Sequence, residues 1–332
     1  MPGMKAMVLA AGVGKRMRPL TDQLPKPLLP IANRPVMGYI LEHLARHGFT
    51  QVIANLHYRG DDIVACFGDG ARYGVDLSYS QEEKLWGIAG GVRRCKDFFG
   101  EDTFLVIGAD DLTDMDLTAL VQAHRRAGAI ASIGLVEVED TSEYGIVVTD
   151  EEGRIERFVE KPKGEPPSRT ANTQIYLFEP AVFEFIPPDT VYDFGFDAFP
   201  SMVESKAPFY GFCLPGYWRD IGSMKDYLAA QRDVLEVRVR ARIEGEEKEP
   251  GLWFGKGCEV DPQAQLHAPV ALGEGCHVRA KASLGGGTCI GSHVEVGEES
   301  WLWNTVVWEG AAVPPRARLE RAVVTAEGVF WG

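Results

Sequence analysis

A six-residue repeat in the last third of the chain constrains its fold more than any other feature. Aliphatic residues recur at every sixth position, each with a smaller residue two places before it: Val260, Leu266, Leu272, Val278, Leu284, Ile290, Val296 and Leu302. This period fits neither a helix of 3.6 residues per turn nor an isolated strand. It is typical of a β-helix, where one aliphatic and one small side chain per hexad fill the bore. We therefore expect a β-helix domain over residues 251–332.

The preceding residues have a different pattern, in which strand-like and helix-like segments alternate. Strands are expected at 5–11, 51–56, 75–80, 103–107, 130–138, 144–149, 154–160 and 174–178. Helices are expected at 35–46, 61–67, 89–98, 117–127 and from 224 to about 240. Such alternation predicts a mostly parallel sheet covered on both faces. We expect an α/β domain over residues 1–244, followed by a polar linker, 245–251 (GEEKEPG).

Charge and cysteine content exclude several classes of protein. The chain has 34 Lys and Arg against 48 Asp and Glu, a net charge of −14, which argues against a nucleic-acid-binding surface. Its apolar runs near the start are too short for a membrane span or a signal peptide. The six cysteines form no CxxC pair and no zinc-like spacing, so we expect reduced thiols and a cytoplasmic protein. We interpret Cys258 and Cys276 as bore residues of the β-helix.

A glycine-rich loop follows the first expected strand and reads LAAGVGKRMRPLTDQLPKP over residues 9–27. A strand that runs into Gly12-Val13-Gly14 can bring backbone N–H groups close to phosphate oxygens. The dinucleotide fingerprint would need a glycine at Met17, and the Walker loop would need Ser or Thr at Arg16. Between residues 12 and 30 four basic side chains stand against one acidic one, a local charge of +3: Lys15, Arg16, Arg18, Lys26 and Asp22. The loop therefore predicts a phosphate site of another kind.

This loop closely resembles the signature of sugar-1-phosphate nucleotidylyltransferases, AAGxGxRxxPLTxxxPKP, with every fixed position filled. Further family motifs follow in order: GIAG at 87–90 (GTAG in the family), DDLTD at 110–114 (GDxLTD), EKP at 160–162, Asn172, and YWRDIG at 217–222 (YWxDIG). The resemblance covers about residues 4–240, and a hexapeptide tail is a common appendage. It implies a Rossmann-like, mostly parallel nucleotidyltransferase core followed by a left-handed parallel β-helix.

The resemblance also implies an activity, the Mg²⁺-dependent transfer of a nucleotidyl group from an NTP to a sugar 1-phosphate with release of pyrophosphate. Because the attacking phosphate is already an anion, such chemistry needs positioning, cations and metal rather than a covalent intermediate. GTP with mannose 1-phosphate is the expected pair, and glucose 1-phosphate with dTTP or UTP is the alternative. Two departures bear on this choice: Ile88 replaces the Thr of GTAG, and Gly108-Ala109 stands where Asn-Gly is common.

Site residues carry over from the family position by position. The catalytic set is Arg16, Lys26, Asp110, Lys161 and Asp220, with Asp110 and Asp220 as Mg²⁺ ligands. Arginine suits such a set because its guanidinium grips phosphate with paired hydrogen bonds. The nucleotide-binding set is Ala11, Gly12, Gly14, Lys15, Gln81 and Gly87. The sugar-binding set is Gly145, Glu160 and Asn172, and a metal-binding role for Asp111 stays open.

Two other functions fit parts of the sequence. Hexapeptide β-helices also occur in acyltransferases, where His267, His277 or His293 could act as a base. The uninterrupted hexads give fewer than three coils of three hexads each, which leaves little room for an acyl donor. A regulatory paralogue that binds nucleotide-sugar without turnover is the second alternative, and the retained charged set argues against it.

The tail carries five of the seven tryptophans: Trp253, Trp301, Trp303, Trp308 and Trp331. Because the ends of a solenoid need covering and aromatic residues are enriched in interfaces, we expect these residues to cap the β-helix or to form a subunit interface. The sequence thus predicts a homo-oligomer formed through the β-helix.

Overall fold

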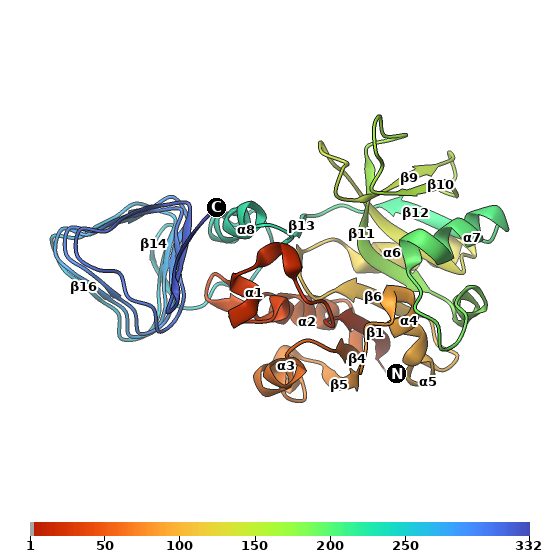
Figure 1. Cartoon of the computed structure of the whole chain (residues 1–332), viewed down its shortest axis with the longest axis horizontal. Helices are drawn as coiled ribbons and strands as arrows, with labels where there is room; N and C mark the ends of the chain where they lie inside the picture. The colour runs from red at the N-terminus through yellow and green to blue at the C-terminus, as the bar shows by residue number, and fades with distance from the viewer. Residues whose placement is uncertain (1–2) are drawn as a thin grey trace.

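The computed structural model describes residues 3–332, which form two domains lying end to end (Figure 1). An α/β domain comes first in the chain, and a three-sided β-helix follows it. The helix α8 (Met224–Leu235) lies between the two. None of the helices in residues 3–332 has the length and apolarity that crossing a membrane would require.

The central sheet of the first domain contains four neighbouring parallel strands in the order β6-β1-β4-β5. Their bounds are Met4–Leu9 (β1), Phe49–Leu56 (β4), Asp76–Gln81 (β5) and Phe104–Gly108 (β6). Helices α2 (Val36–Arg46), α3 (Gly60–Phe67), α4 (Gly87–Arg94) and α6 (Leu117–Ala127) connect or follow them. On β1, Ala6 and Val8 pack into one hydrophobic cluster and Met7 into another, so both faces of the sheet are buried. The expected α/β sheet is confirmed.

The other half of the sheet is mixed in direction. Strand β11 (Thr170–Phe178) pairs antiparallel with β6, β8 (Ala131–Glu137) and β9 (Gly145–Thr149). Strand β9 also pairs with β10 (Ile155–Glu160), and β8 pairs in parallel with β12 (Phe209–Cys213). A separate ribbon joins β7 (Asp111–Thr113) to β13 (Trp218–Asp220). The sequence did not predict β7, β12 or β13.

Two expected helices have different bounds in the structure. The segment 89–98 forms two helices, α4 and α5 (Lys96–Phe99), which meet at Cys95. The helix expected to reach residue 240 ends at Leu235, because Val237 takes a left-handed φ of 56°. The chain then turns back, and the backbone N–H of Arg240 donates to Asp114 Oδ2 over 2.6 Å.

The C-terminal domain is a β-helix whose chain returns to the same face after eighteen residues, so that Leu252, Val270 and Thr288 stack in register. One face holds β15 (Leu252–Phe254), β18 (Val270–Leu272), β21 (Thr288–Ile290), β24 (Val306–Val307) and β26 (Ala322–Thr325). The second holds β16 (Glu259–Val260), β19 (His277–Val278) and β22 (Glu295–Val296), and the third holds β17 (Gln265–Leu266), β20 (Ser283–Gly285), β23 (Trp301–Trp303) and β25 (Arg318–Glu320). Cys276 is buried in the bore, Cys258 packs against it, and both thiols are free.

The segment 245–251 is not a linker. Strand β14 (Glu246–Glu249) pairs antiparallel with β15 and forms the first edge of the β-helix, while β27 (Gly328–Trp331) pairs antiparallel with β26 at the other edge. The coils also extend beyond the hexad pattern, since Val306 stacks on Val323 after seventeen residues. The β-helix is therefore longer than the uninterrupted hexads indicate.

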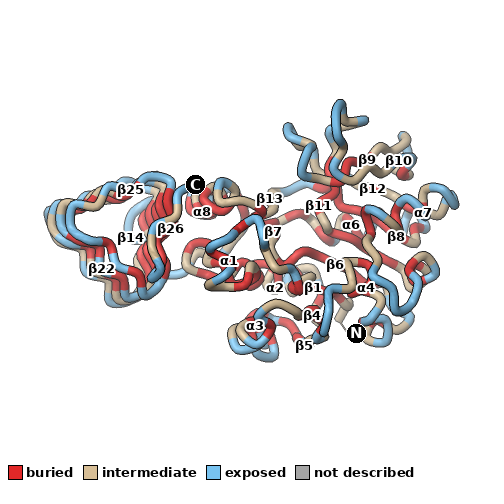
Figure 2. The backbone as a smooth tube through the Cα atoms, viewed as in Figure 1, coloured by how far each residue is buried: buried red, intermediate tan, exposed pale blue. Residues whose placement is uncertain are grey.

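One face of the β-helix packs against the α/β domain. Ala271, Cys289, Val306 and Val323 share a hydrophobic cluster with Tyr227 and its neighbours on α8, and buried residues follow this face in Figure 2. Trp308 is a buried member of the same cluster, so the expectation that the tail tryptophans cap the solenoid or bind another subunit is wrong for this residue, and the half-buried Trp253 packs against the cluster. The remaining three lie elsewhere: Trp301 and Trp303 stack on β23, and Trp331 is exposed on β27.

Candidate active site

The carboxyl ends of β1, β4 and β6 meet at one edge of the sheet, where open α/β folds bind ligands. The glycine-rich loop leaves β1 at this edge. Gly14 takes a left-handed φ of 66°, and a Cβ atom there would lie 2.8 Å from Thr21 Cγ2. The hydroxyl of Thr21 donates to the Gly14 carbonyl over 2.9 Å and fixes the loop. Gly14 is thus required by both conformation and space.

A partly buried charge cluster lies beside this loop. Lys26 donates hydrogen bonds to Asp110 and, over 3.2 Å, to Asp220 Oδ1. Burial alone would lower the pKa of Lys26, but the two carboxylates raise it above its ordinary value, so the amine stays charged. The structure thereby joins three residues from the predicted catalytic set although they are far apart in the sequence.

Three carboxylates surround this lysine. One oxygen each of Asp110, Asp111 and Asp220 lies within 4.8 Å of the others. Burial, and next the nearby charge of Asp110, raise the pKa of Asp111 and of Asp220. Carboxylate oxygens are the ligands that Mg²⁺ prefers in proteins. The donor set therefore fits a divalent cation.

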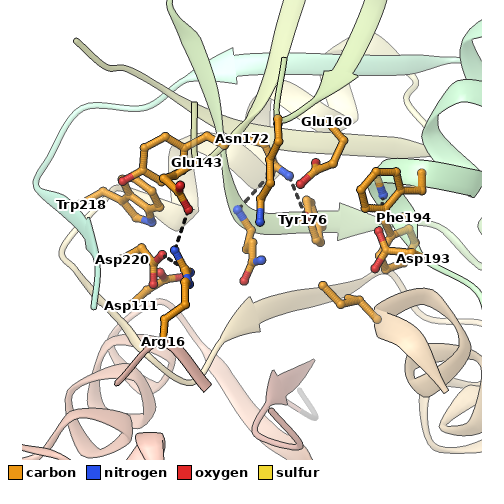
Figure 3. A pocket seen from close by; sticks show the side chains of 17 residues that line it. Arg16, Asp111, Glu143, Glu160, Asn172, Tyr176, Asp193, Phe194, Trp218 and Asp220 are labelled. Atoms are coloured by element: carbon orange, nitrogen blue, oxygen red, sulfur yellow. Dashed lines mark hydrogen bonds and ion pairs between the residues drawn. The ribbon is translucent and has the colours of Figure 1, made fainter. Parts of the chain in front are cut away.

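Arg16 projects from the loop toward the same carboxylates (Figure 3). Its Nη1 donates to Glu143 Oε2 over 2.9 Å and its Nη2 to Asp220 Oδ2 over 3.4 Å. The Arg16 side chain is 54% exposed, so the ion pair with Glu143 is weak and can be exchanged for a phosphate. Glu143 was not predicted from the sequence.

A cavity of about 230 Å³ opens beside Arg16 (Figure 3). It is lined by six residues that the sequence predicted: Arg16, Gly145, Glu160, Lys161, Asn172 and Asp220. It is also lined by residues that the sequence did not predict, among them Tyr144, Gln174, Tyr176, Asp193, Phe194 and Trp218. The predicted sugar-binding set therefore shares one polar cavity with part of the catalytic set.

A bulge in β11 aims polar groups into this cavity. The pairing register with β8 shifts between Asn172 and Tyr176, and Gln174 between them takes a φ of 58°. The amide of Asn172 donates to Tyr176 Oη over 2.9 Å and accepts from the backbone N–H of Gln174 over 2.9 Å. Bulges re-aim side chains in this way next to active sites.

Glu160 reaches the cavity because two glycines leave it room. A Cβ atom at Gly145 would lie 2.7 Å from Glu160 Oε2, and one at Gly195 would lie 2.6 Å from it. Burial raises the pKa of Glu160, and the charge of Lys161 acts in the opposite direction. The side chains of Glu160 and Lys161 both line the cavity. The backbone of Lys161 takes a left-handed φ of 45°.

A second cavity, of about 290 Å³, adjoins the first through shared residues Ile88, Gln174 and Asp193. Of the predicted residues it is lined by Ala11, Gly12, Gly87 and Asp110. Gly87 takes a φ of 74°, and a Cβ atom there would lie 2.4 Å from the carbonyl oxygen of Tyr192. No larger residue fits this turn without movement of the wall.

Asn55 and Glu82 also line the second cavity, and the sequence did not predict them. Asn55 is the penultimate residue of β4, accepts a hydrogen bond from the backbone N–H of Ala10 over 2.9 Å and donates to Glu82 Oε1 over 2.7 Å. Glu82 is only 3% exposed. The position of Asn55 at the carboxyl end of a parallel strand was the one signal that could have identified it.

Three predicted nucleotide-binding residues line neither cavity: Gly14, Lys15 and Gln81. Gln81 is exposed, and its Oε1 would lie 3.1 Å from a Cβ atom at Gly60 on α3. Side chains alternate between the faces of a strand, which turns Gln81 away from the side that Glu82 occupies. Lys15 is exposed, and Gly14 is half-buried.

Comparison with known proteins assigns this site to a family. Residues 5–237 match the family model described as "Nucleotidyl transferase". The chain belongs to this family. A UTP–glucose-1-phosphate uridylyltransferase of Synechocystis sp. is 40% identical over 332 residues, covering 95% of this chain and 86% of that protein. A mannose-1-phosphate guanylyltransferase of Mycobacterium tuberculosis is 32% identical over 317 residues, covering 95% and 83%.

A solved structure has an architecture similar to about two thirds of this chain. A candidate glucose-1-phosphate thymidylyltransferase from Bacillus anthracis, in complex with a sucrose, superposes with a TM-score of 0.62 at 27% identity. The match covers 68% of this chain and 93% of that one. The family resemblance inferred from the sequence is confirmed, and this nucleotidyl transferase is an enzyme of sugar-1-phosphate nucleotidyl transfer.

Proposed function

We propose that this enzyme transfers a uridylyl group from UTP to glucose 1-phosphate with Mg²⁺ as cofactor, giving UDP-glucose and pyrophosphate. The observation that carries the reaction type is the Lys26–Asp110–Asp220 cluster, in which Asp220 lines the first cavity and Asp110 lines the second. The substrate pair is supported by the Synechocystis uridylyltransferase, whose 40% identity extends over 95% of this chain and therefore includes the β-helix.

The two cavities suit the two substrates. The second cavity, beside Ala11 and Gly12, would take the base, and the glycine-rich loop would carry the triphosphate. The first cavity would take the sugar, with Lys161 on its phosphate and Glu160 and Asn172 on its hydroxyls. The sugar phosphate and the α-phosphate would then meet beside the charge cluster.

The chemistry follows from this placement. An oxygen of the sugar phosphate attacks the α-phosphorus, the bond to the β-phosphate oxygen breaks, and pyrophosphate leaves with the electron pair. Lys26 and Arg16 would stabilise the charge that develops on the α-phosphate, Arg16 by exchanging Glu143 for phosphate oxygens. A bound Mg²⁺ would neutralise phosphate charge and orient the phosphates. Asp110 and Asp220 are the residues that would hold it.

A second candidate is GTP with mannose 1-phosphate, the pair expected from the sequence. The Mycobacterium tuberculosis guanylyltransferase supports it at 32% identity, and so does the carboxylate of Glu82 at the wall of the second cavity. Guanine presents two adjacent donors, N1–H and the 2-amino group, that match one carboxylate. Uracil presents a single N–H between two acceptors, so Glu82 would match it less well.

Pyrophosphate release tests both candidates. The assay combines UTP, dTTP, GTP, ATP and CTP with glucose, mannose and galactose 1-phosphates in the presence of Mg²⁺. We expect the highest kcat/KM for UTP with glucose 1-phosphate. A higher value for GTP with mannose 1-phosphate would support the second candidate, and the absence of release from every pair would contradict the proposal.

A further inference from the structure

Asp111 is a buried carboxylate that the proposed reaction leaves without a role. Its residue is 2% exposed, and its Oδ2 has no hydrogen-bond partner among residues 3–332. An uncompensated buried charge is costly, so a group that offsets it is expected nearby. The charges of the residues around Asp111 indicate that this group is a cation.

Asp111 faces another carboxylate directly. In the β7–β13 ribbon it pairs with Asp220, and Asp110 precedes it in the chain, with oxygens of all three within 4.8 Å of one another. Like charges opposite each other on paired strands repel. Lys26 donates to Asp110 and Asp220 but makes no hydrogen bond to Asp111. One largely buried amine therefore faces one buried and two half-buried carboxylates.

Gly108 keeps the space around this cluster open. A Cβ atom there would lie 2.7 Å from Asp111 Oδ2 and 3.0 Å from Asp110 Oδ1. This is the position where an asparagine is common in the family, and a side chain there would displace the Asp111 carboxylate. The glycine at 108 and the carboxylate at 111 therefore depend on each other.

We propose that Asp111 is a third carboxylate ligand of the divalent-metal centre, together with Asp110 and Asp220, and that this enzyme binds its metal before the nucleotide. The inference rests on the Mg²⁺ requirement of the proposed function. Magnesium in proteins usually takes one or two carboxylates and completes its coordination with substrate phosphates and water. A third carboxylate moves part of that coordination from the nucleotide to the protein, which favours metal binding to the free enzyme.

The test is Mn²⁺ binding to the nucleotide-free, full-length protein, measured from the electron paramagnetic resonance signal of free Mn²⁺. We expect Asp111→Asn and Asp111→Val each to raise the Kd at least tenfold, while Glu151→Gln, which removes a charge from an exposed turn, leaves it within twofold. Asparagine and valine are both close to aspartate in size and shape, so both variants should fold. Circular dichroism checks this. An unchanged Kd in both Asp111 variants would overturn the proposal.

A double-mutant cycle tests the dependence on Gly108. Gly108→Ala should weaken Mn²⁺ binding more in the wild-type background than in the Asp111→Val background, because the displaced Asp111 carboxylate is then absent and only the contact with Asp110 Oδ1 remains. Independent effects of the two substitutions would overturn the steric link.

Failure of this proposal can be told apart from failure of the proposed function. No Mn²⁺ binding without nucleotide, combined with Mg²⁺-dependent pyrophosphate release from UTP and glucose 1-phosphate, would overturn the role of Asp111 alone. Tight Mn²⁺ binding that depends on Asp111, combined with no release from any substrate pair, would support that role and overturn the proposed function alone.

Discussion

Trp308 of the β-helix and Tyr227 of α8 form a buried hydrogen bond between the two domains, with the indole Nε1 donating to the phenol oxygen over 3.0 Å. The phenol in turn donates to the Pro30 carbonyl over 2.8 Å. Gln231 donates to the same carbonyl over 2.6 Å and accepts from the backbone N–H of Ala32 over 2.7 Å. Because Pro30 shortly follows Lys26 in the chain, the β-helix supports the segment that carries this lysine.

Substitution of Trp308 should therefore reduce stability. Trp308→Phe keeps most of the ring packing and loses the hydrogen bond, and we expect it to cost about 1 kcal/mol. Trp308→Ala also opens a cavity and should cost about 3–5 kcal/mol. Urea denaturation measures both values, with Trp303→Phe on the outer face as the control, expected within about 0.5 kcal/mol. An equal effect of Trp308→Ala and Trp303→Ala would contradict the domain contact.

Gly87→Ala should impair nucleotide binding. The new Cβ atom would meet the Tyr192 carbonyl oxygen at 2.4 Å in a backbone conformation with a φ of 74°, so the wall of the second cavity must move. We expect about 1–3 kcal/mol of destabilisation and a KM for the nucleotide raised by about tenfold. Steady-state kinetics measures the change. Gly128→Ala, with a φ of 60° and open space around its Cβ position, is the matched control and should leave KM unchanged.

Lys26→Met should affect both stability and turnover. Removing the amine leaves the half-buried Asp110 without its cation and Asp220 with Arg16 alone, which we expect to destabilise the metal-free protein by about 1–3 kcal/mol. The transition state also loses a cation, so kcat should fall by about 100-fold or more. Thermal unfolding without metal and single-turnover kinetics measure these effects. Lys96→Met, at an exposed position on α5, should change neither, and near-normal turnover of Lys26→Met would show that Lys26 is not catalytic.

The exposed tryptophans of the β-helix allow a direct test of the predicted oligomer. Trp303 is 36% exposed and Trp331 is 62% exposed, and neither contributes to the contact between the domains. If the β-helix forms a subunit interface through them, Trp303→Glu and Trp331→Glu should lower the mass measured by light scattering to that of one chain. An unchanged mass in both variants would contradict an interface at these residues.

The sequence was most informative where a pattern is local or where several family motifs follow one another in a fixed order. Alternation of small and aliphatic residues predicted the bore of the β-helix, because a six-residue step permits few other folds. The spacing of family motifs brought Arg16, Lys26, Asp110 and Asp220 into one hypothesis, and in the structure they contact one another.

The sequence was least informative where the partner lies far along the chain or the pattern is polar. The pair between Arg16 and Glu143 joins residues 127 positions apart, and nothing local to Glu143 indicates it. Strand β14 has the sequence EEKE, without apolar alternation, because its place is set by backbone pairing with β15 rather than by burial of side chains.

His43 gives the protein a predictable loss of stability in acid. Its ring is fully buried on α2, and neither ring nitrogen has a hydrogen-bond partner among residues 3–332. Burial, and next the nearby charges of His47 and Arg46, lower the pKa of His43 from 6.5 to about 3. The folded state therefore holds a neutral imidazole that the unfolded chain protonates below pH 6.5. The contribution of the neutral His43 to the free energy of unfolding is complete above pH 6.5 and is lost as the pH falls from 6.5 toward 3.

His43→Leu isolates this effect. The unfolding free energy of the wild type relative to the variant should fall by about 1.4 kcal/mol between pH 7.5 and pH 5.5, because only the wild type must exclude a proton from this site. Urea denaturation at the two pH values measures the difference. His277→Gln, on the outer face of the β-helix, should show no such change relative to the wild type. A difference between wild type and His43→Leu that stays constant with pH would show that His43 is not held neutral by its surroundings.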